Sequence, residues 1–132
     1  KESDVASWRG IAFEEVCLKH ISQIKYALHI GAVSSQESSL IVKGNEEADG
    51  MQIDLLIDRA DDAVNVCEMK FNKVPYAVTK GYAQVLNSRL QALEEKNPAK
   101  TFLLTYVGNS ELVSNEYSDI FRASVTLDDL FI

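Results

Sequence analysis

The spacing of apolar residues divides the chain into segments of helical and of extended period. From Ser3 to about residue 29, apolar residues recur at steps of three, four and five, which is typical of one face of a helix. Ser3 or Asp4 is suited to cap the start of this helix, and Gly31 is placed to end it. The pattern therefore predicts a long first helix with a single apolar stripe.

Three strands are predicted next, over residues 33–42, 51–58 and 63–71. The second strand alternates apolar and polar residues, so that one face is expected to carry Met51, Ile53, Leu55 and Ile57. The third is apolar on both faces, as is usual for a strand in the interior of a sheet. A short polar segment, 59–62, joins the second and third strands and predicts an antiparallel hairpin.

The remainder of the chain predicts a second helix followed by a fourth strand. Thr79 introduces the helix, which runs to Lys96 before Asn97-Pro98 ends it. The fourth strand covers residues 101–107, and the last residues predict a short extended segment and a helical turn. Because helix, three strands, helix and strand follow one another without repeat or linker, residues 1–132 are expected to form one α/β (α+β) domain around a central mixed sheet.

Composition favours an ordinary globular domain and argues against binding nucleic acid by bulk charge. The chain is 46% hydrophobic and 25% charged, and its net charge is −7. Domains that grip nucleic acid electrostatically usually carry a basic excess, although an acidic active centre with local cations is compatible with this charge. No apolar run approaches the roughly 20 residues that span a bilayer. No membrane association is therefore expected, and the expected setting is cytoplasmic.

The cysteines and histidines show no metal-ligand spacing. Cys17 and Cys67 lie in helix and strand interiors without a CxxC motif, so they are expected to be reduced and buried. His20 and His29 are interpreted as surface or helix-end residues.

Candidate chemistry is concentrated on Asp54 and on the triplet Glu68-Met69-Lys70 of the next strand. Glu68 and Lys70 point the same way, about 7 Å apart along the strand. If Asp54 lies opposite Glu68, position 56 pairs with 66 and 58 with 64, which leaves a five-residue loop. That register would bring Asp54, Glu68 and Lys70 to one face, whereas a four-residue loop would separate the carboxylates. The prediction is therefore that the three side chains project from one face, or that the site does not exist.

Two adjacent carboxylates are costly unless a cation lies between them. Their hard oxygen ligands suit Mg²⁺ or Mn²⁺ with retained waters. Such an ion polarises a phosphate and lowers the pKa of a bound water, and a nearby ammonium can orient that water. The residues therefore predict a phosphodiesterase-type metal site held by Asp54 and Glu68, with the Met69 backbone carbonyl as an added ligand.

Two stretches, Gln52-Ile53-Asp54-Leu55-Leu56-Ile57-Asp58 and Val66-Cys67-Glu68-Met69-Lys70, resemble the PD-(D/E)xK nuclease motif. The element order also resembles the restriction-endonuclease-like core of that superfamily. More narrowly, the opening at 8–17, the hairpin and the ending at 125–131 resemble the C-terminal domain of a group of prokaryotic AAA-type ATPases. The resemblance covers nearly the whole chain, with the departure that Gln52 stands where many relatives have a second acid.

The resemblance implies roles for residues on both helices. An acidic residue of the first helix would join the site, with Glu14 the best match and Glu15 the alternative. Lys80, Tyr82 or Gln84 of the second helix would assist it. It further implies a Mg²⁺-dependent nuclease domain that acts on nucleic acid, with DNA favoured. That domain would be attached to an ATPase domain in a longer chain, and a start at Lys1 rather than Met is in keeping with a fragment. No GxxxxGK[ST] phosphate loop occurs, so any ATPase activity would belong to another segment.

Less specific interpretations stay open. The acidic charge and Gln52 favour a non-catalytic descendant that binds nucleic acid or a protein partner. A structural domain that regulates or assembles an ATPase would instead expose a large apolar patch and would have no basic surface near Asp54. Asp58 is interpreted as solvated, and Glu14, Lys80 and Gln84 are equally explained as helix-surface residues. The oligomeric state is left open, a homo-oligomer included.

Overall fold

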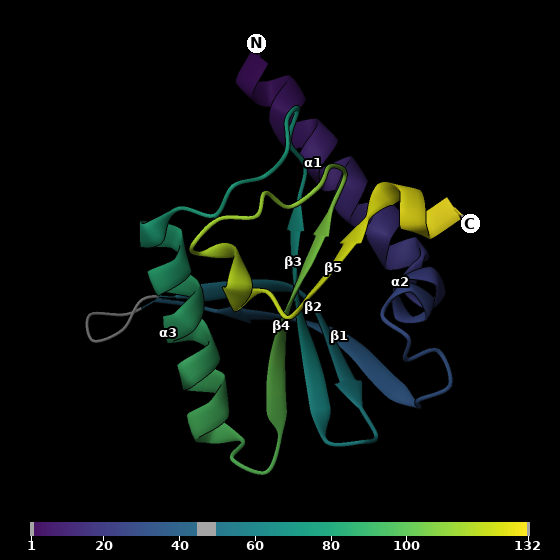
Figure 1. The fold of residues 1–132 in the computed structure, drawn as a ribbon, viewed down its shortest axis with the longest axis vertical. Coiled ribbons are helices and arrows are strands. Elements are labelled where there is room, and N and C mark those ends of the chain that lie inside the picture. The colour runs from purple at the N-terminus through teal and green to yellow at the C-terminus, as the bar shows by residue number, and fades with distance from the viewer. Residues whose placement is uncertain (1, 45–49, 132) are drawn as a thin grey trace.

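The computed structural model describes residues 2–44 and 50–131, which form three helices, a five-stranded sheet and two 3-10 turns (Figure 1). In chain order the elements are α1 (Glu2–Lys19), α2 (Ile21–Ala27), β1 (Ser35–Val42), β2 (Met51–Arg59), β3 (Ala63–Lys70), α3 (Lys80–Lys96), β4 (Thr101–Gly108), η1 (Ser118–Ile120), β5 (Ala123–Thr126) and η2 (Leu127–Phe131). This confirms the predicted α+β class and the order of helix, three strands, helix and strand. Within the described ranges, no helix is long and apolar enough to cross a bilayer.

The sheet is mixed, as predicted, and its strands lie in the order β1-β2-β3-β4-β5. The pairs β1–β2 and β2–β3 are antiparallel, whereas the pairs β3–β4 and β4–β5 are parallel. Helix α3 provides the crossover that parallel β3 and β4 require. Strand β3 is central and is buried continuously from Val64 to Glu68, which confirms that it is an interior strand.

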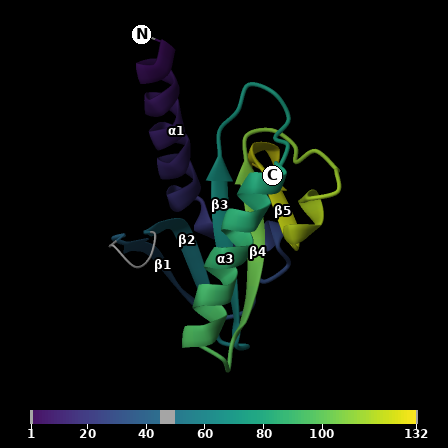
Figure 2. The same ribbon diagram turned by 90° about the vertical axis from the view of Figure 1, so that its left-hand side faces the viewer.

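Helices cover both faces of the sheet, and each face has its own apolar core (Figure 2). The α1-side core is formed by α1, α2, η2 and the sheet, and its members include Phe13, Cys17, Ile24, Leu55, Cys67, Val107 and Leu130. The α3-side core lies beneath α3, and its members include Ile53, Val66, Leu86, Leu93, Leu104 and Tyr106. Along β3, Val66 faces α3 and Cys67 faces α1, so Glu68 and Lys70 project toward α3.

A β-bulge in β2 overturns part of the predicted side-chain pattern. Ser38 pairs with Leu56 and Leu40 pairs with Ile53, so two residues of β2, Asp54 and Leu55, lie opposite one residue of β1. The extra residue reverses the alternation, and Ile53 joins the α3-side core while Leu55 joins the α1-side core. The prediction that Met51, Ile53, Leu55 and Ile57 share one face is therefore wrong.

The predicted hairpin register is confirmed. Asp58 lies opposite Val64 and Leu56 opposite Val66, which leaves positions 59–63 between the last paired residues. Asp62 adopts the left-handed conformation in this turn, with a φ of 65°. Helix α3 also begins as predicted, because the Thr79 hydroxyl accepts a hydrogen bond from the Tyr82 amide at 3.2 Å.

The predicted single first helix is wrong in two respects. It is interrupted at His20, whose φ of −122° and ψ of 33° are not helical, so α1 and α2 are separate. Helix α2 ends before Gly31, with His29 at a left-handed φ of 62°. The amides of His29 and Ile30 donate to the carbonyls of Tyr26 (3.0 Å) and Lys25 (2.9 Å), which is a Schellman motif. Buried Ile30 fixes this end point, and His29 is a helix-end residue as interpreted.

Candidate functional site

Asp54 meets the Glu68-Met69-Lys70 triplet at the point where β2 leaves β3. Among the described residues, the ladder between these strands ends at the pair Leu55–Cys67. One residue further, Asp54 Oδ2 accepts a hydrogen bond from the Met69 amide at 3.2 Å. The carboxylate thus takes the place of a backbone acceptor for the Met69 amide, and we attribute the orientation of the Asp54 side chain to the bulge.

Glu68 is buried, with 6% of its surface exposed, and its carboxylate is surrounded by donors on the α3 side. Oε2 accepts a hydrogen bond from the Tyr82 hydroxyl and lies 3.2 Å from Lys70 Nζ. Oε1 lies 3.7 Å from a guanidinium nitrogen of Arg89. A buried carboxylate is costly without such partners, so this set accounts for the burial of Glu68.

Lys70 is held between aromatic rings in addition to its pairing with Glu68. Its Nζ donates to the Tyr82 hydroxyl at 3.1 Å and lies 4.5 Å from the centre of the Tyr82 ring and 5.6 Å from that of Tyr76. Burial by itself lowers the pKa of Lys70, but the Glu68 carboxylate and the two tyrosines together raise it above its ordinary value. Lys70 is therefore an ammonium at neutral pH, and its chemistry is that of a donor and a positive charge rather than of a base.

The Asp54 carboxyl is electrostatically strained. Burial raises its pKa, the Met69 amide lowers it and the Glu68 carboxylate raises it again, and the net direction is upward. Glu14, on α1, also has a raised pKa, through burial and then through the charge of Asp54. The structure therefore brings Glu14, Asp54, Glu68 and Lys70 into one electrostatic neighbourhood. Asp54 is influenced by charges on both faces of the sheet, because Glu14 belongs to α1 and Glu68 and Lys70 project toward α3. That Asp54 shares one face with Glu68 and Lys70 stays a prediction.

The segment that follows β3 is fixed by β4 and its following loop. The Asn109 side chain accepts from the Asn72 amide at 2.8 Å and donates to the Asn72 carbonyl at 2.7 Å. Tyr76 forms a bridge with Leu112, and its ring stacks on Tyr106 at 5.8 Å. These contacts hold the Tyr76 ring in place beside the Lys70 ammonium.

Of the predicted helix residues, Tyr82 reaches the site, whereas Lys80 and Gln84 are exposed. Glu15 is exposed as well. Arg89 was not predicted, although a sequence signal for it exists. It lies seven residues after Tyr82, on the stripe that also carries buried Leu86 and Leu93. A cation in an apolar helical stripe indicates a buried anion opposite it, which here is Glu68.

Asp54 and Glu68 are the candidate ligands for a hard divalent cation. Within residues 2–44 and 50–131, no group of three or more His, Cys, Asp or Glu side chains is arranged to hold a metal ion. Mg²⁺, however, is commonly bound by one or two carboxylates together with waters and substrate phosphates. Asp54 and Glu68 offer two such carboxylates, and a cation between them would relieve the strain on Asp54.

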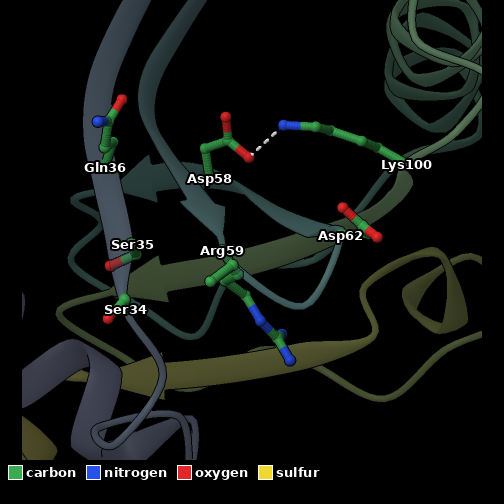
Figure 3. A pocket seen from close by; sticks show the side chains of 8 residues that line it. Ser34, Ser35, Gln36, Asp58, Arg59, Asp62 and Lys100 are labelled. Atoms are coloured by element: carbon green, nitrogen blue, oxygen red, sulfur yellow. Dashed lines mark hydrogen bonds and ion pairs between the residues drawn. The ribbon is translucent and has the colours of Figure 1, made fainter.

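A pocket of about 480 Å³ lies at the hairpin end of the sheet, and Asp54, Glu68 and Lys70 are not among its lining residues (Figure 3). Asp58 and Lys100 face each other across it at 2.7 Å. Arg59 also lines it, with its guanidinium held by Asp61 at 2.7 Å. Asp58 was interpreted as a solvated residue, and the structure adds an ion pair that is largely accessible to solvent. Both cations have carboxylate partners, and a third carboxylate, that of Asp62, also lines the pocket.

The α1 helix exposes several apolar side chains. Trp8 is 69% exposed and Ile11 is 59% exposed, and with Leu18 they form one stripe along the helix. The two cysteines, in contrast, are unbridged and buried, as predicted. Burial raises the pKa of the Cys17 thiol to about 12, and that of Cys67 is raised as well.

Comparison with known proteins supports the fold. No family model matches the sequence, and no curated protein matches it. The fold is similar to the crystal structure of a protein of unknown function, AF1548, with a TM-score of 0.54 and 15% sequence identity. The likeness covers 84% of this chain and 63% of that protein, so the chain spans less than two thirds of its length. At this identity the likeness supports the α+β architecture alone.

Proposed function

We propose that the chain is a metal-dependent nuclease domain that hydrolyses phosphodiester bonds of nucleic acid, with DNA the favoured substrate. The observation that carries this proposal is the hydrogen bond from the Met69 amide to Asp54, next to the pair formed by Glu68 and Lys70. The proposed cofactor is Mg²⁺ or Mn²⁺, held by Asp54, Glu68 and the Met69 carbonyl. Following the PD-(D/E)xK resemblance, the domain is proposed to serve an ATPase domain of a longer, cytoplasmic chain.

Each residue has a physical role in this proposal. A bound metal ion supplies polarisation of the phosphate and a water of lowered pKa. The Lys70 ammonium orients the attacking water and stabilises negative charge that develops on the phosphate oxygens. Tyr82 holds Lys70 and Glu68 in place through its hydroxyl. Glu14 acts as an outer acidic group that strengthens the attraction for a cation.

A plasmid-nicking assay with Mg²⁺ and with Mn²⁺ tests the proposal. The Lys70→Met variant is expected to nick roughly 100-fold more slowly than the wild type, because it loses the donor that stabilises developing charge. Lys100→Met is the matched control, since its ammonium pairs with Asp58 at the hairpin end. Absence of nicking by the wild type with either metal, or equal rates for the wild type and Lys70→Met, would contradict the proposal.

A specific observation favours a second candidate, a non-catalytic module that binds nucleic acid or a protein partner. Lys70 and Arg89 already compensate the Glu68 carboxylate without a metal ion. Gln52, which replaces a second acid of the motif, is exposed on β2 and adds no charge to the site. This candidate predicts binding without nicking, and the same assay therefore separates the two.

A further inference from the structure

A groove of about 420 Å³ runs along α3 beside the start of β2 and adjoins the candidate site. Its volume lies within the range of small-molecule sites, roughly 300–1,000 Å³. Six of its lining residues combine hydrogen-bonding and apolar chemistry: Met51, Gln84, Val85, Ser88, Arg89 and Ala92. Gln84 and Ser88 are one helical turn apart and form a polar row. Val85 and Arg89, also one turn apart, place an apolar side chain beside a cation in the adjacent row.

Arg89 links this groove to the candidate site. It lines the groove while its guanidinium lies 3.7 Å from Glu68 Oε1, which is longer than a charge-assisted hydrogen bond. Its side chain keeps 24% of its surface accessible. A guanidinium carries five donors, so Arg89 can face Glu68 and still offer donors to an anion in the groove.

The lining favours a single strand over a duplex. Arg89, Gln84 and Ser88 are suited to phosphate and sugar oxygens. The apolar side chains, of which Val85 is 43% exposed, are suited to the face of an unstacked base. A duplex keeps its bases stacked inside and cannot lay one against this surface. The net charge of −7 removes bulk attraction for nucleic acid, so a single local cation should weigh heavily in binding.

We propose that the α3 groove binds a nucleotide of a single-stranded nucleic acid, with Arg89 anchoring its phosphate and Val85 contacting its base. The inference extends the proposed nuclease function, because it delivers a strand to Asp54 and Glu68, but its test does not depend on cleavage. Binding of a fluorescein-labelled single-stranded DNA 12-mer is measured by fluorescence anisotropy in EDTA and again with Ca²⁺, alongside the matching duplex.

Arg89→Gln is expected to weaken binding of the single strand roughly tenfold and to reduce the salt dependence of log K by about 0.7. Lys19→Gln removes an equal charge from an exposed position at the end of α1 and should leave both quantities unchanged. Arg89→Lys keeps the charge and should keep the salt dependence. Val85→Ser, which leaves the Glu68 contacts intact, should weaken binding of the 12-mer but not of an abasic strand of equal length.

The proposal is overturned if the wild type binds no strand under either condition, or if it binds the duplex more tightly. It is overturned as well if both Arg89→Gln and Val85→Ser bind like the wild type. Strand binding by a chain that does not nick DNA would support the groove and contradict the nuclease function, so the two failures are distinguishable.

Discussion

Replacement of Asp54 by asparagine is expected to stabilise the fold at neutral pH. The Asp54 carboxylate is half-buried, and burial raises its pKa. The hydrogen bond from the Met69 amide lowers this pKa, and the nearby Glu68 carboxylate raises it, with a net upward shift. Asparagine is nearly isosteric, and its side-chain oxygen can still accept from the Met69 amide, which now lies at 3.2 Å. The substitution therefore removes desolvation and repulsion while it keeps the hydrogen bond.

The expected gain in the free energy of unfolding is about 1 kcal/mol, in the range found when strained functional positions are relieved. It is limited because asparagine also loses the attraction of Lys70 and Arg89, both of which lower the Asp54 pKa. For a chain of 132 residues, this gain corresponds to an increase in Tm of about 4 °C.

The pH dependence has a defined sign. A carboxyl whose folded pKa is raised contributes stability that is complete below its unfolded pKa, about 3.9 for aspartate, and is lost as the pH rises through the folded pKa. The advantage of Asp54→Asn over the wild type should therefore be largest at neutral pH and vanish below about pH 4. Urea unfolding monitored by circular dichroism at a series of pH values measures it.

Asp58→Asn is the matched control, because Asp58 pairs with Lys100 in a pair that solvent largely screens. It should change stability by less than about 1 kcal/mol, toward destabilisation. If Asp54→Asn instead destabilised the fold by about 1 kcal/mol or more at neutral pH, Asp54 would be a structural carboxylate that the Met69 amide requires as its acceptor. The strained-site account would then be refuted.

Three further predictions concern the fold. Gly108→Ala should destabilise the fold by about 2 kcal/mol in urea unfolding, because the new Cβ would collide with the buried Tyr106 phenol. Gly10→Ala is the control: its Cβ would meet open space on α1, and the substitution should stabilise the fold. His29→Gly should add about 1 kcal/mol by removing the cost of a left-handed side-chain residue, and no increase in Tm would refute the strain assigned to that turn. The two buried thiols should react with Ellman's reagent only after unfolding, because burial raises both pKa values, and rapid reaction of the native chain would contradict their burial.

Much of the fold could be predicted from the spacing of apolar residues, because the helices and strands must bury apolar side chains in one or both of the two cores. The register of the hairpin was left open by the sequence, because a four-residue loop would have given the opposite parity. With 58 opposite 64 as the last pair, a five-residue connection fixes the parity that brings position 54 toward 68. Helix α3 was predictable, since Thr79 caps it and Asn97-Pro98 follows it.

The features that could not be predicted are those that interrupt the regular spacing of apolar and polar residues. The bulge at Asp54 and Leu55 inserts one residue into β2, and the alternating letters 51–58 give no sign of it. Only its partner β1 and the two cores reveal that Ile53 and Leu55 face opposite ways. Yet this irregularity is what turns Asp54 toward the Met69 amide.

The predicted site was incomplete for a related reason. Charged residues of a helix are usually solvated, so the spacing of α3 alone did not assign Arg89 to the site, and Lys80 was predicted only from the PD-(D/E)xK resemblance. In the structure Lys80 is exposed and Arg89 faces Glu68, because the buried carboxylate on β3 requires a counter-charge from the helix above it. Burial of Glu68 was the missing information, and it depends on how α3 packs on the sheet.

Calorimetric titration of Mn²⁺ into the wild type, Asp54→Asn and Asp58→Asn tests the central claim most directly. The claim is that Asp54 and Glu68 together form a binding site for a divalent cation. The account predicts saturable binding by the wild type, equal binding by Asp58→Asn, and at least roughly tenfold weaker binding by Asp54→Asn, which lacks one of the two carboxylates. Equal binding by all three proteins, or no binding by the wild type, would contradict it.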